Sequence, residues 1–142
     1  MSSKEYDLIC SLGGYCAAAH NLRFRNLRTF ALPFDWTYFT DDNAIYILAD
    51  NFENEFQNYM LKENLKELPK NSEHMDKVQH EDTYAHIIWA NHFNKHIDDI
   101  NSDYPIVKEK FNKRFKRLID LTEKSKKILF LFFTNYMIKK NL

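Results

Sequence analysis

The two glycines of this chain stand next to each other, at Gly13 and Gly14, and no glycine occurs elsewhere in its 142 residues. The phosphate-cradling loop GxxxxGK[ST] and the dinucleotide-binding turn GxGxxG each need more glycines than this pair supplies. The sequence therefore argues against nucleotide binding through either loop. It also places the only freely flexible backbone of the chain at one point, where a short apolar segment ends.

Composition narrows the class of protein further. The length suits a single domain over residues 1–142, and 44% hydrophobic residues are enough to build a core. Twenty basic residues balance twenty acidic ones, so we expect neither nucleic-acid binding nor binding to an anionic membrane. Two cysteines are too few for a disulfide scaffold, and the N-terminus lacks a secretory apolar run. We therefore expect a cytoplasmic protein. The longest apolar run, Ile128 to Phe133, is too short to cross a membrane.

The first part of the chain predicts a strand, a turn and a helix. Residues 6–12 are apolar enough for a buried strand, and the alanine-rich segment from Cys16 to about Asn26 favours a helix. Residues 27–32 have an extended pattern. Residues 33–36 should form a loop, because proline disfavours helix at the residue before it.

The middle of the chain is predicted to be helical and then polar. Residues 40–68 match two helices, and the second should carry Phe52, Phe56 and Met60 on one face. Residues 69–82 lack apolar periodicity, so we expect a surface loop there.

The last part predicts a strand, a helix and a strand. The first strand is expected at residues 84–90, followed by a long helix with Pro105 in its first turn and a buried strand at 128–133. This order suggests a right-handed crossover and a parallel pair. We therefore expect an α/β fold with a short, mainly parallel sheet flanked by helices.

Cys16 lies where the predicted strand turns into the predicted helix. The N–H groups and the dipole of a helix N-terminus favour an anion, which promotes the thiolate form. The backbone from Gly13 and Gly14 to Tyr15 could hold an oxyanion, because glycines let a substrate approach closely. Cys16 could equally be a small apolar residue packing beside the alanines, as free cysteines commonly do. Cys10, inside the strand, is expected in the core.

A thiol enzyme also needs a base, and among six histidines His92 is best placed. It lies at the carboxyl end of a predicted strand, and the ligand crevice of an open α/β sheet lies outside those ends. Asn91 or Asp35 could orient its ring. Asp35 could instead accept backbone N–H groups and fix its own loop.

Two further patterns involve charged or metal-binding residue types. His92 and His96 are four residues apart, but a metal would need a third ligand such as Asp98 or Asp99 and no cysteine lies nearby, so we expect no metal site.

A basic helix face could bind a phosphate or sulfate group through Arg114 and Arg117, or it could simply be solvated; its residues are Lys110, Lys113, Arg114 and Arg117.

Several separated segments together resemble one family. They are Ser11-Leu12-Gly13-x-x-Cys16, Leu27–Phe30 with Pro33–Trp36, Asn51–Asn54 with Lys62–Leu65, Lys108–Leu118 and Lys127–Phe130. The combination resembles a bacterial family of unknown function named "putative papain-like cysteine peptidase", and the likeness covers nearly the whole chain. The resemblance implies that Cys16 is the nucleophile. It also implies an α+β papain-like fold as the alternative to the α/β sheet.

The chain departs from the family pattern at two places. Members carry His-Asp-Phe or His-His-Phe where this chain has Asn91-His92-Phe93. Because asparagine cannot take a proton from a thiol, either His92 serves as the base or this copy is inactive. Family members also continue well past the Ile128 strand, so we expect the C-terminal part of the family domain to be missing.

Three functions are compatible with these residues. The leading hypothesis is a cysteine peptidase or thiol-dependent acyl hydrolase or transferase, with Cys16 as nucleophile and His92 as general base. The alternatives are a non-catalytic domain that holds an anionic phosphosugar at Arg114 and Arg117, and an inactive truncated remnant. No cofactor is expected. The substrate, whether peptide or small molecule, and the oligomeric state do not follow from the sequence.

Overall fold

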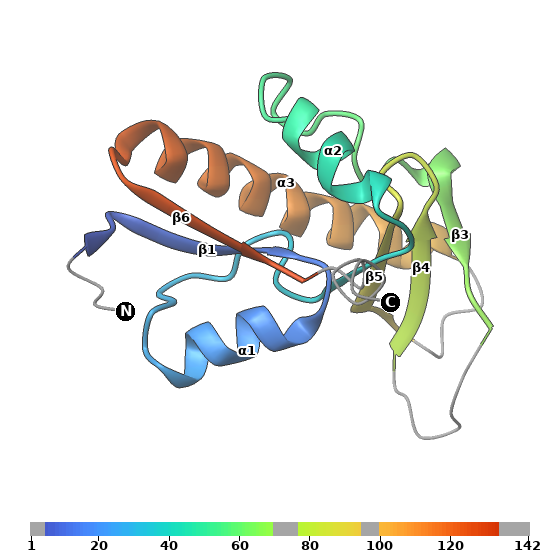
Figure 1. The fold of residues 1–142 in the computed structure, drawn as a ribbon. Helices are drawn as coiled ribbons and strands as arrows, with labels where there is room; N and C mark the ends of the chain where they lie inside the picture. Colours follow the sequence, from blue (N-terminus) through green and yellow to red (C-terminus); the bar gives the residue numbers. More distant parts are fainter. Residues whose placement is uncertain (1–4, 70–76, 95–99, 134–142) are drawn as a thin grey trace, which may run out of the picture.

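The computed structural model describes residues 5–69, 77–94 and 100–133 (Figure 1). These segments form three α-helices, one 3₁₀ helix and six strands. In chain order they are β1 (Leu8–Gly13), α1 (Cys16–Phe24), β2 (Thr37–Phe39), α2 (Asn43–Asp50), η2 (Lys62–Asn64), β3 (Leu65–Glu67), β4 (Lys77–Asp82), β5 (Ile87–Asn94), α3 (Ile100–Lys124) and β6 (Ile128–Phe132).

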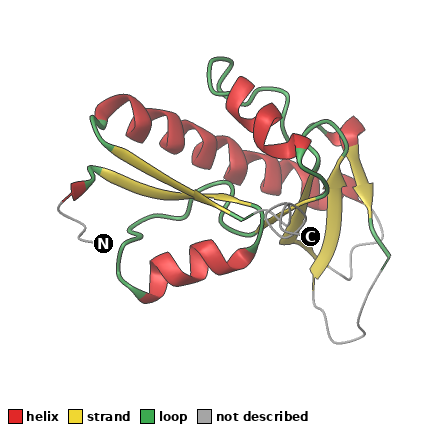
Figure 2. Ribbon diagram, in the orientation of Figure 1, coloured by secondary structure: helices red, strands yellow, loops and turns green. Residues whose placement is uncertain are grey.

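The strands are divided between two sheets (Figure 2). β1 and β6 form a parallel pair, whereas the four-stranded sheet has the order β2-β5-β4-β3 and is antiparallel throughout. Helices and strands are mixed as predicted, but the prediction of a mainly parallel sheet is wrong. The expected pairing of β5 with β6 does not form, because β2 and β4 occupy the two edges of β5 and β6 pairs with β1 instead.

The β1–β6 pair lies between two helices, with α1 and α3 on opposite sides of it (Figure 1). The buried face of α1 consists of Ala18, Ala19 and Leu22. Alanine side chains are short, so this helix can pack closely on β1. Phe130 and Phe132 of β6 are partly exposed, so the strand predicted at 128–133 forms but is less buried than expected.

Aromatic side chains from distant parts of the chain fill the core. Trp89 of β5 packs edge-on against Phe111 of α3 with 4.8 Å between ring centroids, and Phe56 stacks on Phe115 at 5.3 Å. Phe34 touches the rings of both Trp89 and Phe115. The long helix α3 is confirmed, but it begins at Ile100, so Pro105 lies in its second turn rather than its first.

The second helix predicted within residues 40–68 does not form. Residues 51–60 are a series of turns, in which Glu55, Phe56 and Met60 have left-handed backbone with φ between 53° and 59°. Their N–H groups find partners outside a helix: the Asp82 carboxylate accepts from Met60 at 2.7 Å. The apolar spacing correctly predicted which side chains are buried, because Phe56 and Met60 are in the core. Its prediction of a helix was wrong.

Two other secondary-structure predictions are corrected. Residues 69–82 were expected to form a loop, yet residues 77–82 are strand β4 and only 70–76 lie outside the described residues. The inward positions of β4 include His80 and Asp82, which are buried but polar, so the sequence shows no apolar alternation. Residues 27–32 were expected to be extended, but they form no strand.

Candidate functional site

A tight turn joins β1 to α1 and places Cys16 at the first position of the helix. Gly13 and Gly14 have φ of 93° and 86°, which side-chain-bearing residues rarely adopt. Neighbouring atoms also leave no space for a Cβ, which would collide with the Thr37 hydroxyl at Gly13 and with the Phe133 carbonyl at Gly14. Both glycines are therefore required by conformation and by close approach.

The N-terminus of α1 is not capped by its own side chains. Tyr15 occupies the N-cap position with extended backbone and makes no side-chain hydrogen bond to the helix, and the first turn contains no acidic residue. The first N–H groups of a helix have no partner within the helix. This end of α1 therefore suits a negative charge such as a thiolate or an oxyanion.

Cys16 is half-buried, and Tyr38 of β2 is close enough for the two residues to interact. Burial raises the pKa of Tyr38, and its hydrogen bond with Cys16 raises it further. The Tyr38 ring packs edge-on against Tyr15 at 5.5 Å, and Tyr15 also contacts Phe133 at 6.4 Å. Tyr15, the residue before Cys16, is thus in contact with one ring from β2 and one ring from the segment after β6.

Cys10 contrasts with Cys16. It lies in β1 with 1% of its surface exposed, as predicted for a core residue. Burial, with a smaller contribution from the charge of Asp35, raises the pKa of its thiol to about 12. Cys10 therefore remains a thiol at neutral pH.

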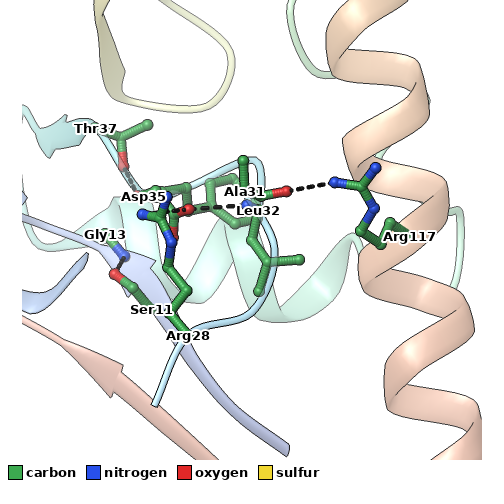
Figure 3. A network of polar contacts seen from close by, with 9 residues as sticks. Ser11, Gly13, Arg28, Ala31, Leu32, Asp35, Thr37 and Arg117 are labelled. Carbon is green, nitrogen blue, oxygen red and sulfur yellow. Dashed lines mark hydrogen bonds and ion pairs between the residues drawn. The ribbon is translucent and has the colours of Figure 1, made fainter. Parts of the chain in front are cut away.

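Asp35 stabilises the loop that supports the Cys16 turn (Figure 3). Its Oδ2 accepts the Leu32 N–H at 2.8 Å and lies 3.0 Å from Nη1 of Arg28. Burial raises the pKa of this carboxyl, opposed by the Leu32 N–H and by Arg28. Thr37 follows as the first residue of β2, and its hydroxyl donates to the Phe34 carbonyl at 2.9 Å. The hydroxyl and the carbonyl are the groups that crowd Gly13.

The predicted anion-binding arginines contact their own protein. Nη1 of Arg117 donates to the Ala31 carbonyl at 3.0 Å, which holds the same loop on α3 (Figure 3), and its guanidinium covers the Phe30 ring. Arg114 covers the Phe111 ring at 5.4 Å, and burial lowers its pKa, opposed by the charge of Asp35. Anion binding by these two residues stays a prediction.

His92 is in β5, buried, and bound to α3. Its Nδ1 lies 3.1 Å from Nζ of Lys110, and its ring packs edge-on against Phe111 at 4.7 Å. Within residues 5–69, 77–94 and 100–133, no hydrogen bond joins Cys16 to His92. Asn91 precedes His92 in β5. The roles of His92 as base and of Asn91 or Asp35 as its orienter therefore stay predictions.

His96, Asp98 and Asp99, considered above as metal ligands, lie outside the described residues. No group of three potential metal-binding side chains occurs in the part of the chain that the structure describes. None of the helices seen there is long and apolar enough to cross a bilayer.

A separate cavity of about 600 Å³ lies between the turns of residues 54–61 and α3. Its walls include Phe56, Phe115 and Ile119, with Lys108 and Lys116 among the charged residues. Nζ of Lys108 donates to the Tyr59 carbonyl at 2.8 Å. No residue of the Cys16 turn lines this cavity.

Comparison with known proteins identifies the family. A family model described as "Putative papain-like cysteine peptidase (DUF1796)" matches residues 7–141. The chain belongs to this family. No curated protein and no solved structure shows significant similarity to it. Membership in DUF1796 confirms the resemblance noted from the sequence, and it supports peptidase chemistry at the level of the family.

Two residues near Cys16 were not singled out from the sequence. Tyr38 interacts with Cys16 from β2, and no spacing in the sequence links positions 16 and 38. His20 is exposed on α1, four residues after Cys16. Residues four apart on a helix are neighbours on its surface, so this signal was present in the sequence.

Proposed function

We propose that this DUF1796 protein is a thiol-dependent acyl hydrolase or transferase, with peptides or small acyl compounds as substrates and Cys16 as the nucleophile. The observation that carries the proposal is the position of Cys16, which is the first residue of an uncapped helix after two obligatory glycines. The family description points to the same chemistry. Cys10 is excluded as nucleophile by its burial and raised pKa.

The proposed reaction has two steps. A base removes the Cys16 proton, and Sγ attacks the substrate carbonyl to give a tetrahedral oxyanion. The backbone N–H groups at the start of α1 would stabilise this charge. Collapse expels the amine or alcohol, which takes up the proton from the base, and leaves a thioester on Cys16. Water or an acceptor then releases the acyl group and regenerates the thiol.

The test is acylation by p-nitrophenyl acetate, followed by release of p-nitrophenolate and by peptide mapping. We expect one acetyl group on Cys16 and a burst equal to the enzyme concentration. Cys16→Ala should abolish both, whereas the matched variant Cys10→Ala should keep them. Acetylation of Cys16→Ala at the wild-type rate would show that another residue carries the chemistry.

The base is assigned by a second pair of variants. General bases contribute about 10²–10⁴-fold to rate, so His92→Gln should slow acylation by at least about 100-fold if His92 takes the proton. His20→Gln should then have little effect. The reverse result would move the base to α1, where His20 lies one turn beyond the thiol.

A further inference from the structure

The cavity between residues 54–61 and α3 has walls that are joined by hydrogen bonds. The Tyr104 hydroxyl of α3 donates to the Met60 carbonyl at 3.0 Å and accepts the Lys62 N–H at 3.2 Å. One turn further along the helix, Nζ of Lys108 donates to the Tyr59 carbonyl at 2.8 Å. These contacts hold the turns on α3, so the cavity is preformed. Its volume of about 600 Å³ is within the range of about 300–1,000 Å³ that is common for small-molecule sites.

The least exposed side chains of the cavity wall are apolar. Phe56 stacks on Phe115 with 5.3 Å between ring centroids, and Ile119 lies one turn beyond Phe115 on α3. All three belong to the hydrophobic core, where close packing keeps side chains in place. The apolar part of a ligand would therefore leave water for a fixed apolar surface, which is favourable.

The charged side chains that line the cavity differ in how their charges are balanced. Nζ of Lys116 lies 3.4 Å from the Asp120 carboxylate, and Glu55 is exposed to solvent. Lys108 is half-buried, and within the part of the chain that the structure describes no carboxylate lies within 4.0 Å of its Nζ. The cavity thus has one partly buried cation without an ion pair among the described residues.

The surroundings of Lys108 favour an anionic partner. Burial lowers the pKa of this lysine, opposed by the more distant charges of Asp82 and Glu63. An ammonium group has three N–H donors, and the Tyr59 carbonyl accepts one of them. A partly desolvated charge gains more from an opposite charge than an exposed one does.

We propose that this cavity is a binding site for a small monocarboxylate with an apolar body. The carboxylate accepts from Nζ of Lys108, and the apolar body lies on Phe56, Phe115 and Ile119. A single negative charge matches the single cation that is not already paired. The site is independent of the proposed thiol chemistry, because no residue of the Cys16 turn lines it.

The first test compares phenylacetate with phenylacetamide, which has the same shape and no charge, by NMR titration of the backbone amides of the wild-type protein. We expect phenylacetate to bind with a millimolar or lower Kd and at least about tenfold more tightly than phenylacetamide. The shifted amides should belong to residues 54–61 and to α3. Equal affinities, no binding at millimolar concentration, or shifts confined to other segments would overturn the proposal.

Three variants locate the site. Lys108→Met should weaken phenylacetate binding at least about tenfold and leave phenylacetamide binding unchanged, a pattern that general damage to the fold would not give. Lys116→Met is the matched control, since it removes an exposed lysine of the same cavity whose charge is already paired; affinity should change less than about threefold. Asn112→Trp, at an exposed lining position of α3, should block both compounds.

Two results with these variants would contradict the assignment. Equal losses of phenylacetate affinity in Lys108→Met and Lys116→Met would show that the carboxylate responds to net charge and not to Lys108. Unchanged binding in Asn112→Trp would place the ligand outside the cavity. If Lys108→Met does not fold, the comparison of phenylacetate with phenylacetamide in the wild-type protein, together with Asn112→Trp, still decides the proposal.

Discussion

Arg28 and Asp35 form an ion pair under the loop that supports the Cys16 turn, with 3.0 Å between Nη1 and Oδ2. The Asp35 side chain is 1% exposed and that of Arg28 15%. The pair joins the two ends of a segment that has no strand or helix of its own. Its energetic contribution can be measured directly.

Removing one member of this pair should be strongly destabilising. Arg28→Met leaves the Asp35 carboxylate buried without its ion-pair partner, and such losses cost about 3–5 kcal/mol. The double variant Arg28→Met/Asp35→Asn should be less destabilised than the sum of the two single variants. Urea unfolding gives the free energy of unfolding of the two single variants and of the double variant. Glu109→Gln breaks the exposed Glu109–Lys113 pair and should cost about 0.5 kcal/mol or less. Additive losses in the double variant would show that the pair is not coupled.

Gly14→Ala should destabilise the protein and distort the Cys16 turn. The new methyl group would meet the Phe133 carbonyl, and the φ of 86° disfavours any side chain. We expect a loss of at least about 1 kcal/mol together with an altered alkylation rate at Cys16. The opposite change, Asn26→Gly, is the control. Asn26 has a φ of 55° on an exposed turn, so glycine should leave stability unchanged within about 0.5 kcal/mol.

Iodoacetamide should label Cys16 much faster than Cys10 in the folded protein. Cys16 is half-buried at a helix N-terminus, whereas Cys10 is enclosed and burial raises its thiol pKa to about 12. Peptide mapping after a short exposure at pH 7 gives the ratio of the labelling rates of Cys16 and Cys10. The control is the protein unfolded in 6 M guanidinium chloride, in which both thiols are accessible and the two rates should converge. Equal rates in the native protein would contradict the core position of Cys10.

Acid should destabilise the protein through His80. Burial lowers the pKa of this residue below its ordinary value of 6.5, opposed by Glu67 and by a backbone hydrogen bond at Val78. Between the two values the unfolded chain binds a proton that the folded protein does not, so stability falls as the pH is lowered below about 6.5. His80→Phe, beside the Phe93 ring, should reduce this slope in unfolding experiments from pH 7 to pH 5. An unchanged slope in His80→Phe would show that another group causes the loss of stability in acid.

The sequence predicted those elements in which one physical signal dominates. Apolar β1, the alanine-rich α1 and the periodic α3 all form where expected. The helix predicted over residues 51–60 does not form. Apolar side chains at steps of three and four can be buried without a helical backbone when a distant group accepts the backbone N–H groups, and here Asp82 accepts the Met60 N–H. Strand β4 was not predicted, because two of its buried positions are occupied by the polar residues His80 and Asp82, and polar residues are normally expected at the surface.

The candidate site was predictable only where it is local in the sequence. Cys16 follows Gly13 and Gly14 directly, so its place at a strand-to-helix turn could be inferred from composition and spacing. Tyr38 could not, because it comes close to Cys16 through the pairing of β2 with β5. The contact of His92 with Lys110 depends on how α3 lies across β5, which is also tertiary information.

The turn that carries Cys16 is encoded at the beginning of the chain but completed near its end. Gly14 packs against the Phe133 carbonyl, and the Phe133 N–H donates to the Gly13 carbonyl at 3.0 Å. During synthesis on the ribosome, about 120 residues must be added after Gly13 before this hydrogen bond can form. The nascent chain therefore carries Cys16 throughout the synthesis of these residues without the completed turn.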